Sequence, residues 1–123
     1  MVVGNYHKLE GGLSLWALEA LTGSHAAHYS LEKTRWNKLE LVHLEDEDNK
    51  KKCGLRSMDE SFSQVEFFFI LEKYDRHGAA MAAYSRGKSD KNQANGIVEG
   101  HAYSILSIKK CGVGRFIKLR NPW

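Results

Sequence analysis

The sequence predicts an α+β fold in which short helices flank an antiparallel sheet, and three observations support this prediction. Residues 59–77 carry apolar side chains at helical spacing. Residues 79–85 form a short apolar run, AAMAAYS, directly after a glycine. Residues 100–105 and 116–123 are two strand-like runs joined by a connector that contains glycines, which is typical of a β-hairpin. The resulting order is helix, helix, strand, helix, strand and hairpin.

The composition fits one modest soluble domain. The chain has 123 residues, of which 42% are hydrophobic and 27% are charged. A net charge of +3 is too small to indicate a nucleic-acid partner. The acidic run at 45–48 and the lysines at 50–52 largely cancel each other's field.

Targeting features are also missing from the sequence. No apolar run approaches the roughly 20 residues that span a bilayer, and no secretory signal begins the chain. Two cysteines, Cys53 and Cys111, make neither a disulfide framework nor a CxxC metal site. We therefore expect a reducing compartment, with a cytoplasmic location and no transmembrane segment.

The first half of the chain contains two predicted helices and one predicted strand. Residues 2–10 are predicted to form a helix that ends at the glycines 11–12. A second helix is predicted to follow, with Ser14 as its N-cap and Gly23 at its C′ position. Residues 25–31 are predicted to form a strand. The charged residues 32–60, which show little periodicity, are predicted to be mostly loop.

The clearest helix is predicted over residues 59–77. Asp59 and Glu60 would place negative charge at its N-terminus, and Gly78 would end it. Phe67 lies off the main apolar stripe, so the helix is expected to be buried on more than one face. Residues 79–85 then favour a strand, although their alanines would also suit a helix. Residues 86–95 are polar and are predicted to be an exposed loop.

The terminal hairpin brings a histidine to an asparagine. If the turn centres on Cys111, His101 faces Asn121 across the two strands, at a Cβ separation of roughly 5 Å. A carboxamide oxygen there can fix the tautomer and orientation of an imidazole, as a Cys-His-Asn nucleophilic site requires. A surface cross-strand pair is the alternative interpretation. Gly100 would let a ligand backbone approach, and Trp123 could either shield the pair or be a core residue.

Other candidate sites are weaker. Cys111, at the hairpin turn, would lie some 30 Å from His101 along the strand, and Cys53 has no local signature of reactivity. His25 and His28, three residues apart in a predicted strand, would point to opposite faces and have no third ligand nearby. No metal site is predicted.

The hairpin motifs resemble those of the calpain family of cysteine proteases. GIVEGHAYSIL at 96–106 and FIKLRNPW at 116–123 are similar to the strands of the second half of the calpain protease core. YHKLEGG at 6–12 and ALEALTG at 17–23 resemble its helical segments, whereas residues 31–58 match poorly.

This resemblance implies a papain-like fold for residues 1–123. The chain would be a single partial domain, the second protease subdomain, with an antiparallel partial-barrel sheet truncated at its C-terminus. His101 would be the catalytic general base and acid, and Asn121 would orient it. Gly100 and Trp123 would bind substrate. The nucleophilic cysteine would lie upstream, in a partner subdomain outside this chain.

The resemblance therefore implies part of a calcium-dependent endopeptidase that hydrolyses protein substrates. Calcium is implied for the intact enzyme, and no ligand can be assigned to it in this chain. The isolated fragment is expected to be inactive. One alternative is a non-catalytic calpain-homology module that acts in protein interaction. Another is a small α+β binding domain unrelated to the family.

Overall fold

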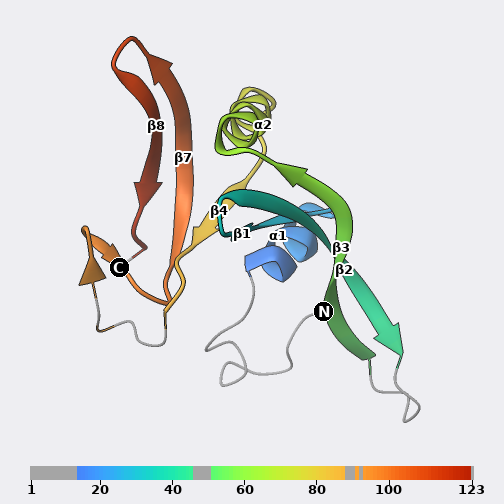
Figure 1. Cartoon of the computed structure of the whole chain (residues 1–123). Coiled ribbons are helices and arrows are strands. Elements are labelled where there is room, and N and C mark those ends of the chain that lie inside the picture. The colour runs from blue at the N-terminus through green and yellow to red at the C-terminus, as the bar shows by residue number, and fades with distance from the viewer. Residues whose placement is uncertain (1–13, 46–50, 88–90, 92, 123) are drawn as a thin grey trace. The chain divides into compact units, whose positions relative to one another are not determined.

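The computed structural model describes residues 14–45, 51–87, 91 and 93–122 (Figure 1). The chain divides into two compact units, Met1–Phe67 and Phe68–Trp123. The expected α+β class is confirmed at this level, because the described elements are helices and antiparallel strands. In chain order the elements are α1 (Ser14–Thr22), β1 (Ala27–Glu32), β2 (Arg35–Glu45), β3 (Lys51–Phe62), α2 (Gln64–Arg76), β4 (Met81–Tyr84), β5 (Gln93–Ala94), β6 (Ile97–Val98), β7 (Ala102–Cys111) and β8 (Gly114–Arg120).

Helix α1 ends where the sequence predicts. The N–H of Gly23 donates to the carbonyl of Glu19 at 2.9 Å, and Gly23 has a φ of 67°. This left-handed conformation is the one that a glycine at C′ adopts without a Cβ penalty. Leu15, on the helix, is buried. The helix expected at residues 2–10 lies outside the described residues.

Strands β1, β2 and β3 form an antiparallel sheet in the first unit, in the order β1-β2-β3. The prediction that residues 32–60 are mostly loop is therefore wrong. Their charges are accommodated because they pair across strands. Glu40 lies opposite Arg56 and forms an ion pair with it. Lys38 Nζ lies 3.8 Å from a carboxylate oxygen of Glu60. Such cross-strand pairs favour strands even where hydrophobic alternation is weak.

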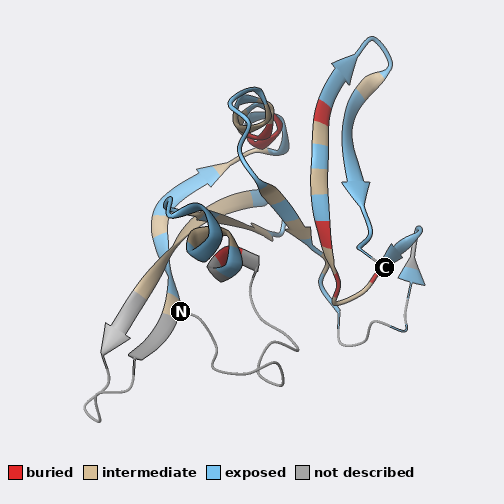
Figure 2. Ribbon diagram, turned by 180° about the vertical axis from the view of Figure 1, so that it is seen from behind, coloured by how far each residue is buried: buried red, intermediate tan, exposed pale blue. Residues whose placement is uncertain are grey.

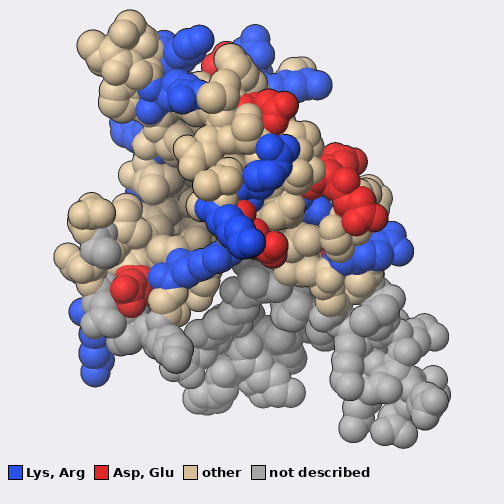
Figure 3. All heavy atoms as spheres, viewed as in Figure 1, with Lys and Arg blue, Asp and Glu red and all other residues tan. Residues whose placement is uncertain are grey.

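Acidic and basic side chains are accordingly interleaved on the surface. Figure 3 shows carboxylates lying between lysine and arginine side chains on the face in view.

The first unit also has an aromatic cluster around Phe67. Its ring stacks on Trp36 at a centroid distance of 4.1 Å and lies 5.1 Å from the ring of Tyr29.

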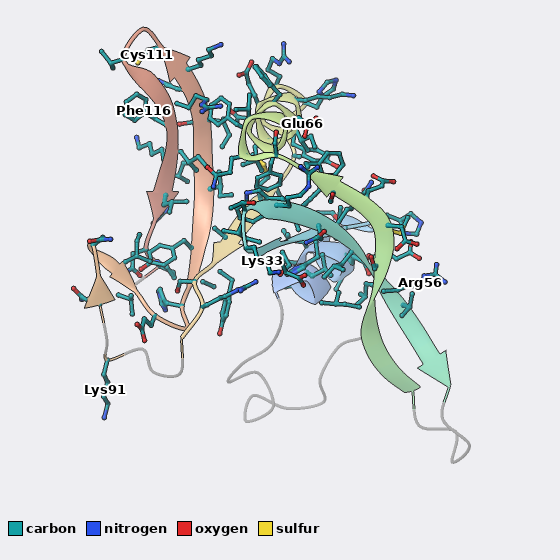
Figure 4. The ribbon with its side chains drawn as sticks, viewed as in Figure 1. Lys33, Arg56, Glu66, Lys91, Cys111 and Phe116 are labelled. Atoms are coloured by element: carbon teal, nitrogen blue, oxygen red, sulfur yellow. The ribbon has the colours of Figure 1, made fainter. Side chains whose placement is uncertain are left out.

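Helix α2 begins later than predicted, because Asp59 and Glu60 belong to β3. Its true start is a capping box at Ser63, and Figure 4 labels the Glu66 that completes it. The Ser63 N–H donates to the Glu66 carboxylate at 2.6 Å, and the Glu66 N–H donates to Ser63 Oγ at 3.2 Å. The hydrogen bond from the Ser63 backbone is the main cause that holds the pKa of Glu66 below its ordinary value. The helix ends before Gly78 as predicted, with a φ of 70° at that glycine.

Replacing Ser63 by alanine is expected to lower the free energy of unfolding by about 1 kcal/mol, since the Glu66 N–H loses its acceptor. Ser63→Asp is the matched control, because aspartate caps a helix about as well as serine. Urea denaturation at neutral pH measures both variants. An alanine variant as stable as the aspartate variant would show that this cap is unimportant.

Phe67 and Phe68, adjacent on α2, are both buried, so the expectation that this helix is buried on more than one face is confirmed. Figure 2 shows buried positions on α2 and at intervals along β7. In the second unit, the Arg115 guanidinium lies over the Phe68 ring, 5.8 Å from its centroid, in a cation–π contact. Asp75, near the end of α2, accepts the N–H of Ile108 at 3.0 Å.

The second unit has a sheet in the order β4-β7-β8 and a small β5-β6 hairpin. The strand expected within residues 79–85 is present as β4, which pairs with β7. The prediction that residues 86–95 form an exposed loop is wrong at its C-terminal end, because Gln93–Ala94 form strand β5. Asn95 and Gly96, both with positive φ, form a two-residue turn between β5 and β6. Asn-Gly suits a hairpin turn that needs positive φ at both positions.

The terminal hairpin is present, but its predicted register is wrong. Cys111 pairs with Gly114, so the turn is Gly112-Val113 and does not centre on Cys111. The register also shifts between Ile105 and Ser107. Because the turn lies later in the chain than predicted, Ile105 lies opposite Leu119 and not opposite Ile117. The bulge adds one residue to β7, which a count outward from the turn cannot detect.

Candidate active site

His101 and Asn121 lie at the open end of the β7–β8 hairpin. His101 directly precedes β7, and Asn121 directly follows β8. The two side chains are joined by a hydrogen bond of 2.9 Å between His101 Nε2 and Asn121 Oδ1. The meeting of ring and carboxamide expected from the sequence is therefore present, although the register that predicted it is wrong.

A diagonal contact reconciles these two findings. Ser104 pairs with Arg120, so continuing the same register would place Asn121 opposite Tyr103 and two residues away from His101. Diagonal neighbours in an antiparallel pair lie about 7–8 Å apart at their backbones, within reach of long side chains. The imidazole and the carboxamide together span that separation.

The hydrogen bond defines the state of the imidazole. An amide carbonyl oxygen can only accept, so Nε2 of His101 must carry the proton that it donates to Asn121 Oδ1. In the neutral ring, Nδ1 is then the unprotonated nitrogen and can accept a proton. The His101 residue is 8% exposed, whereas Asn121 is exposed. The arrangement thus presents a buried imidazole whose Nε2 is held by Asn121.

Tyr103 supports the imidazole from the side. Its ring lies edge-on to the His101 ring, with centroids 5.0 Å apart and planes at 88°. The Tyr103 hydroxyl accepts the N–H of Val98 at 2.8 Å. The sequence places Tyr103 only within a strand motif, because its contact with the turn before β7 depends on how residues 98–101 fold back.

Ser85 is a second residue that sequence reasoning missed. Its hydroxyl lies 3.0 Å from the His101 nitrogen and 2.5 Å from the Val98 carbonyl oxygen. Nothing near Ser85 in the sequence signals this contact, since it arises from the pairing of β4 with β7.

The structure describes only one of the two residues that are predicted to bind substrate. Gly100 precedes His101 and has a φ of 59°, a conformation that suits glycine and turns the chain into β7. Trp123 lies outside the described residues.

Comparison with known proteins decides the family. The model for "Calpain family cysteine protease" matches residues 1–123, which is the whole chain. The chain belongs to the calpain family of cysteine proteases.

Individual calpains align with nearly all of this chain. It is 30% identical to the calpain-type cysteine protease DEK1 of Arabidopsis thaliana over 98% of its length, but spans only 5% of that relative. It is 24% identical to human calpain-9, again over 98% of its length and 14% of the relative. Human calpain-7 is 29% identical over 59% of the chain. No solved structure matched significantly.

Cys111, the cysteine that shares the second unit with His101, does not lie beside it in this calpain chain. Cys111 is exposed at the turn that joins β7 to β8, as Figure 4 shows. It is separated from His101 by the whole of β7, which at about 3.3 Å per residue is roughly 30 Å. Cys53 lies in β3 and belongs to the first unit, so its predicted position in a loop is wrong.

Among the residues that the structure describes, no three or more His, Cys, Asp or Glu side chains gather where they could hold a metal ion. His28 lies half-buried in β1, and burial lowers its pKa. The described helices include none with the length and apolar character needed to cross a membrane.

Proposed function

We propose that this chain supplies the histidine and asparagine of a calpain-like cysteine endopeptidase whose nucleophilic cysteine lies upstream. The observation that carries the proposal is the 2.9 Å hydrogen bond between His101 Nε2 and Asn121 Oδ1. It leaves Nδ1 as the proton acceptor of a buried ring, which is what a thiol nucleophile needs. Membership of the cysteine protease family supplies the reaction class.

In the proposed reaction, Nδ1 of His101 takes the proton of the cysteine thiol. The thiolate attacks the carbonyl carbon of the scissile peptide bond and forms a tetrahedral intermediate. The protonated ring then gives its proton to the leaving amine, so the thioester and the first product form together. Water hydrolyses the thioester, with His101 acting again as the base. Asn121 holds the ring in the same orientation throughout.

The proposal also assigns Gly100 and Trp123 to substrate binding. Gly100 lies next to His101 in the chain, and the absence of a side chain there would let a substrate backbone come close. Trp123 follows Asn121 by two residues and would cover the exposed side of the hydrogen bond. Both assignments rest on the motif resemblance.

Calcium is part of the proposal only for the intact enzyme. The described residues offer no group of carboxylates that fits the six to eight oxygen ligands of this ion. No step of the proposed reaction involves calcium bound to this chain. Its ligands would lie in other parts of the parent protein.

Reconstitution with the upstream half of the parent protein tests the proposal. We expect cleavage of casein only when both halves are present, with loss of activity on alkylation by iodoacetamide. Addition of a calcium chelator tests the metal dependence separately. Activity of the isolated 123-residue chain would contradict the proposal.

The residue at the upstream nucleophile position discriminates the alternative function. Cysteine at that position supports the protease. Another residue there, together with an inactive reconstituted protein, would instead support a calpain-homology module that acts in protein interaction.

A further inference from the structure

Ser85 holds both backbone groups of His101. The N–H of Ser85 donates to the His101 carbonyl at 3.0 Å. The N–H of His101 in turn donates to the Ser85 hydroxyl oxygen at 3.0 Å. Both backbone polar groups of His101, which lies outside a strand, therefore have a hydrogen-bond partner in Ser85.

This contact replaces a step of the β4–β7 ladder. Tyr84 pairs with Ala102, so Ser85 and His101 would be the next antiparallel pair. A hydrogen-bonded antiparallel pair normally exchanges two N–H to carbonyl bonds. Here the first is made by the backbone, and the Ser85 side chain takes the place of its own carbonyl in the second. The ladder can therefore end while His101 stays in place.

The same hydroxyl closes the turn before His101. The Ser85 oxygen lies 2.5 Å from the Val98 carbonyl oxygen and 3.1 Å from the His101 carbonyl oxygen. The single hydroxyl proton favours the nearer acceptor. Val98 is buried, so without this donor its carbonyl would lose its partner at a cost.

Val98 links Ser85 to the imidazole by a second route. Its carbonyl is held by Ser85, and its N–H is held by the Tyr103 hydroxyl at 2.8 Å. The Tyr103 ring is the one that lies edge-on to His101. Ser85 therefore acts on His101 both through the His101 backbone and through the aromatic ring beside the imidazole.

The segment after Ser85 is also packed closely on this turn. A Cβ built on Gly87 would overlap the Cβ of Glu99, and the φ of Gly87 is 149°. This close approach confines residues 98–101 on the side of Ser85.

We infer that Ser85 is a positioning residue for His101. Its hydroxyl bridges the His101 amide and the Val98 carbonyl, and this bridge sets the backbone from which the imidazole reaches Asn121. The kinetic consequence rests on the proposed protease function, whereas the effect on the ring can be measured in this chain alone.

Ser85→Thr and Ser85→Val form a matched pair, because the two side chains have nearly the same shape and differ by the hydroxyl. In the reconstituted protease we expect the valine variant to lower kcat about 10- to 100-fold, with KM within about twofold, since a misplaced base weakens only the transition state. The threonine variant should retain most of the activity. The variants are compared at equal concentrations of folded protein, so loss of folded protein does not enter the comparison. Ser104→Ala, at an exposed position of β7, is the control for serine removal.

Nuclear magnetic resonance of the 123-residue chain gives the second readout. Ring ¹⁵N shifts should show His101 with its proton on Nε2 in the wild type and in the threonine variant. In the valine variant we expect a mixture of tautomers. Hydrogen exchange of the wild-type chain should show the His101 amide protected to the level of the β7 ladder amides.

The outcomes separate this inference from the proposed function. Equal kcat and equal tautomer populations in the threonine and valine variants would overturn the role of Ser85, even in an active protease. If the reconstituted protein is inactive, a tautomer change confined to the valine variant still supports that role. If the valine variant does not fold, an unprotected His101 amide in the wild type overturns it, and a protected one with the threonine variant folded and active supports it.

Discussion

Replacing His101 by alanine is expected to abolish peptide hydrolysis by the reconstituted protease. The thiol would lose the base that removes its proton, and the leaving amine would lose its proton donor. By analogy with other nucleophile–histidine sites, we expect kcat to fall about 10,000-fold or more. The measurement is casein cleavage by the two halves together, at equal concentrations of folded protein.

His25→Ala is the control for histidine removal, because His25 is exposed and belongs to the first unit. It should leave kcat unchanged. If the His101 variant kept the activity of the His25 variant, the assignment of His101 as the base would be wrong.

Replacing Asn121 tests the orientation of the base rather than its presence. Asn121→Ala removes the acceptor of the 2.9 Å hydrogen bond. The ring can then rotate and exchange tautomers, and we expect kcat to fall about 100-fold, in the range that misplacement of a reacting group costs. KM should change little, because Asn121 does not contact substrate in the proposed reaction.

Asn121→Asp is the informative partner variant. It keeps an acceptor oxygen and adds a negative charge next to the ring, which favours the protonated imidazole. We expect most of the orientation to survive and the acidic limb of the activity–pH profile, where the protonated ring cannot act as the base, to move to higher pH. Equal losses in the alanine and aspartate variants would contradict an orienting role for this acceptor.

The sequence predicted the features that depend on local chemistry. Gly23 and Gly78 end their helices with positive φ, as expected of glycine at a helix C-terminus. The terminal hairpin and the meeting of His101 with Asn121 were also predictable, because two strands joined by a short connector bring their outer ends together. These features need only near neighbours or one turn.

The errors come from features set by more distant contacts. Strands β2 and β3 were missed because their charged residues find partners across the sheet, as Glu40 does with Arg56. The signal at Ser63 was available as a serine followed three residues later by Glu66, but the acidic residues Asp59 and Glu60 were preferred as the helix start. The hairpin register failed because the turn is Gly112-Val113 and does not centre on Cys111, and the bulge near Ile105 shifts the pairing by one residue.

Ser85 could not be identified from the sequence for a similar reason. Its contact with His101 follows from the pairing of Tyr84 with Ala102, which brings together residues 16 positions apart. A serine at the end of a strand is common. Only the placement of β4 beside β7 gives this one a connection to the imidazole.

The tautomer of His101 is the most direct measurement of whether Asn121 orients the ring. Ring ¹⁵N spectra of the wild-type chain should show that the neutral form of the ring carries its proton on Nε2 and leaves Nδ1 unprotonated, and Asn121→Ala should abolish this preference. A ring with its proton on Nδ1, or a mixture of tautomers that the Asn121 variant leaves unchanged, would contradict the proposed site.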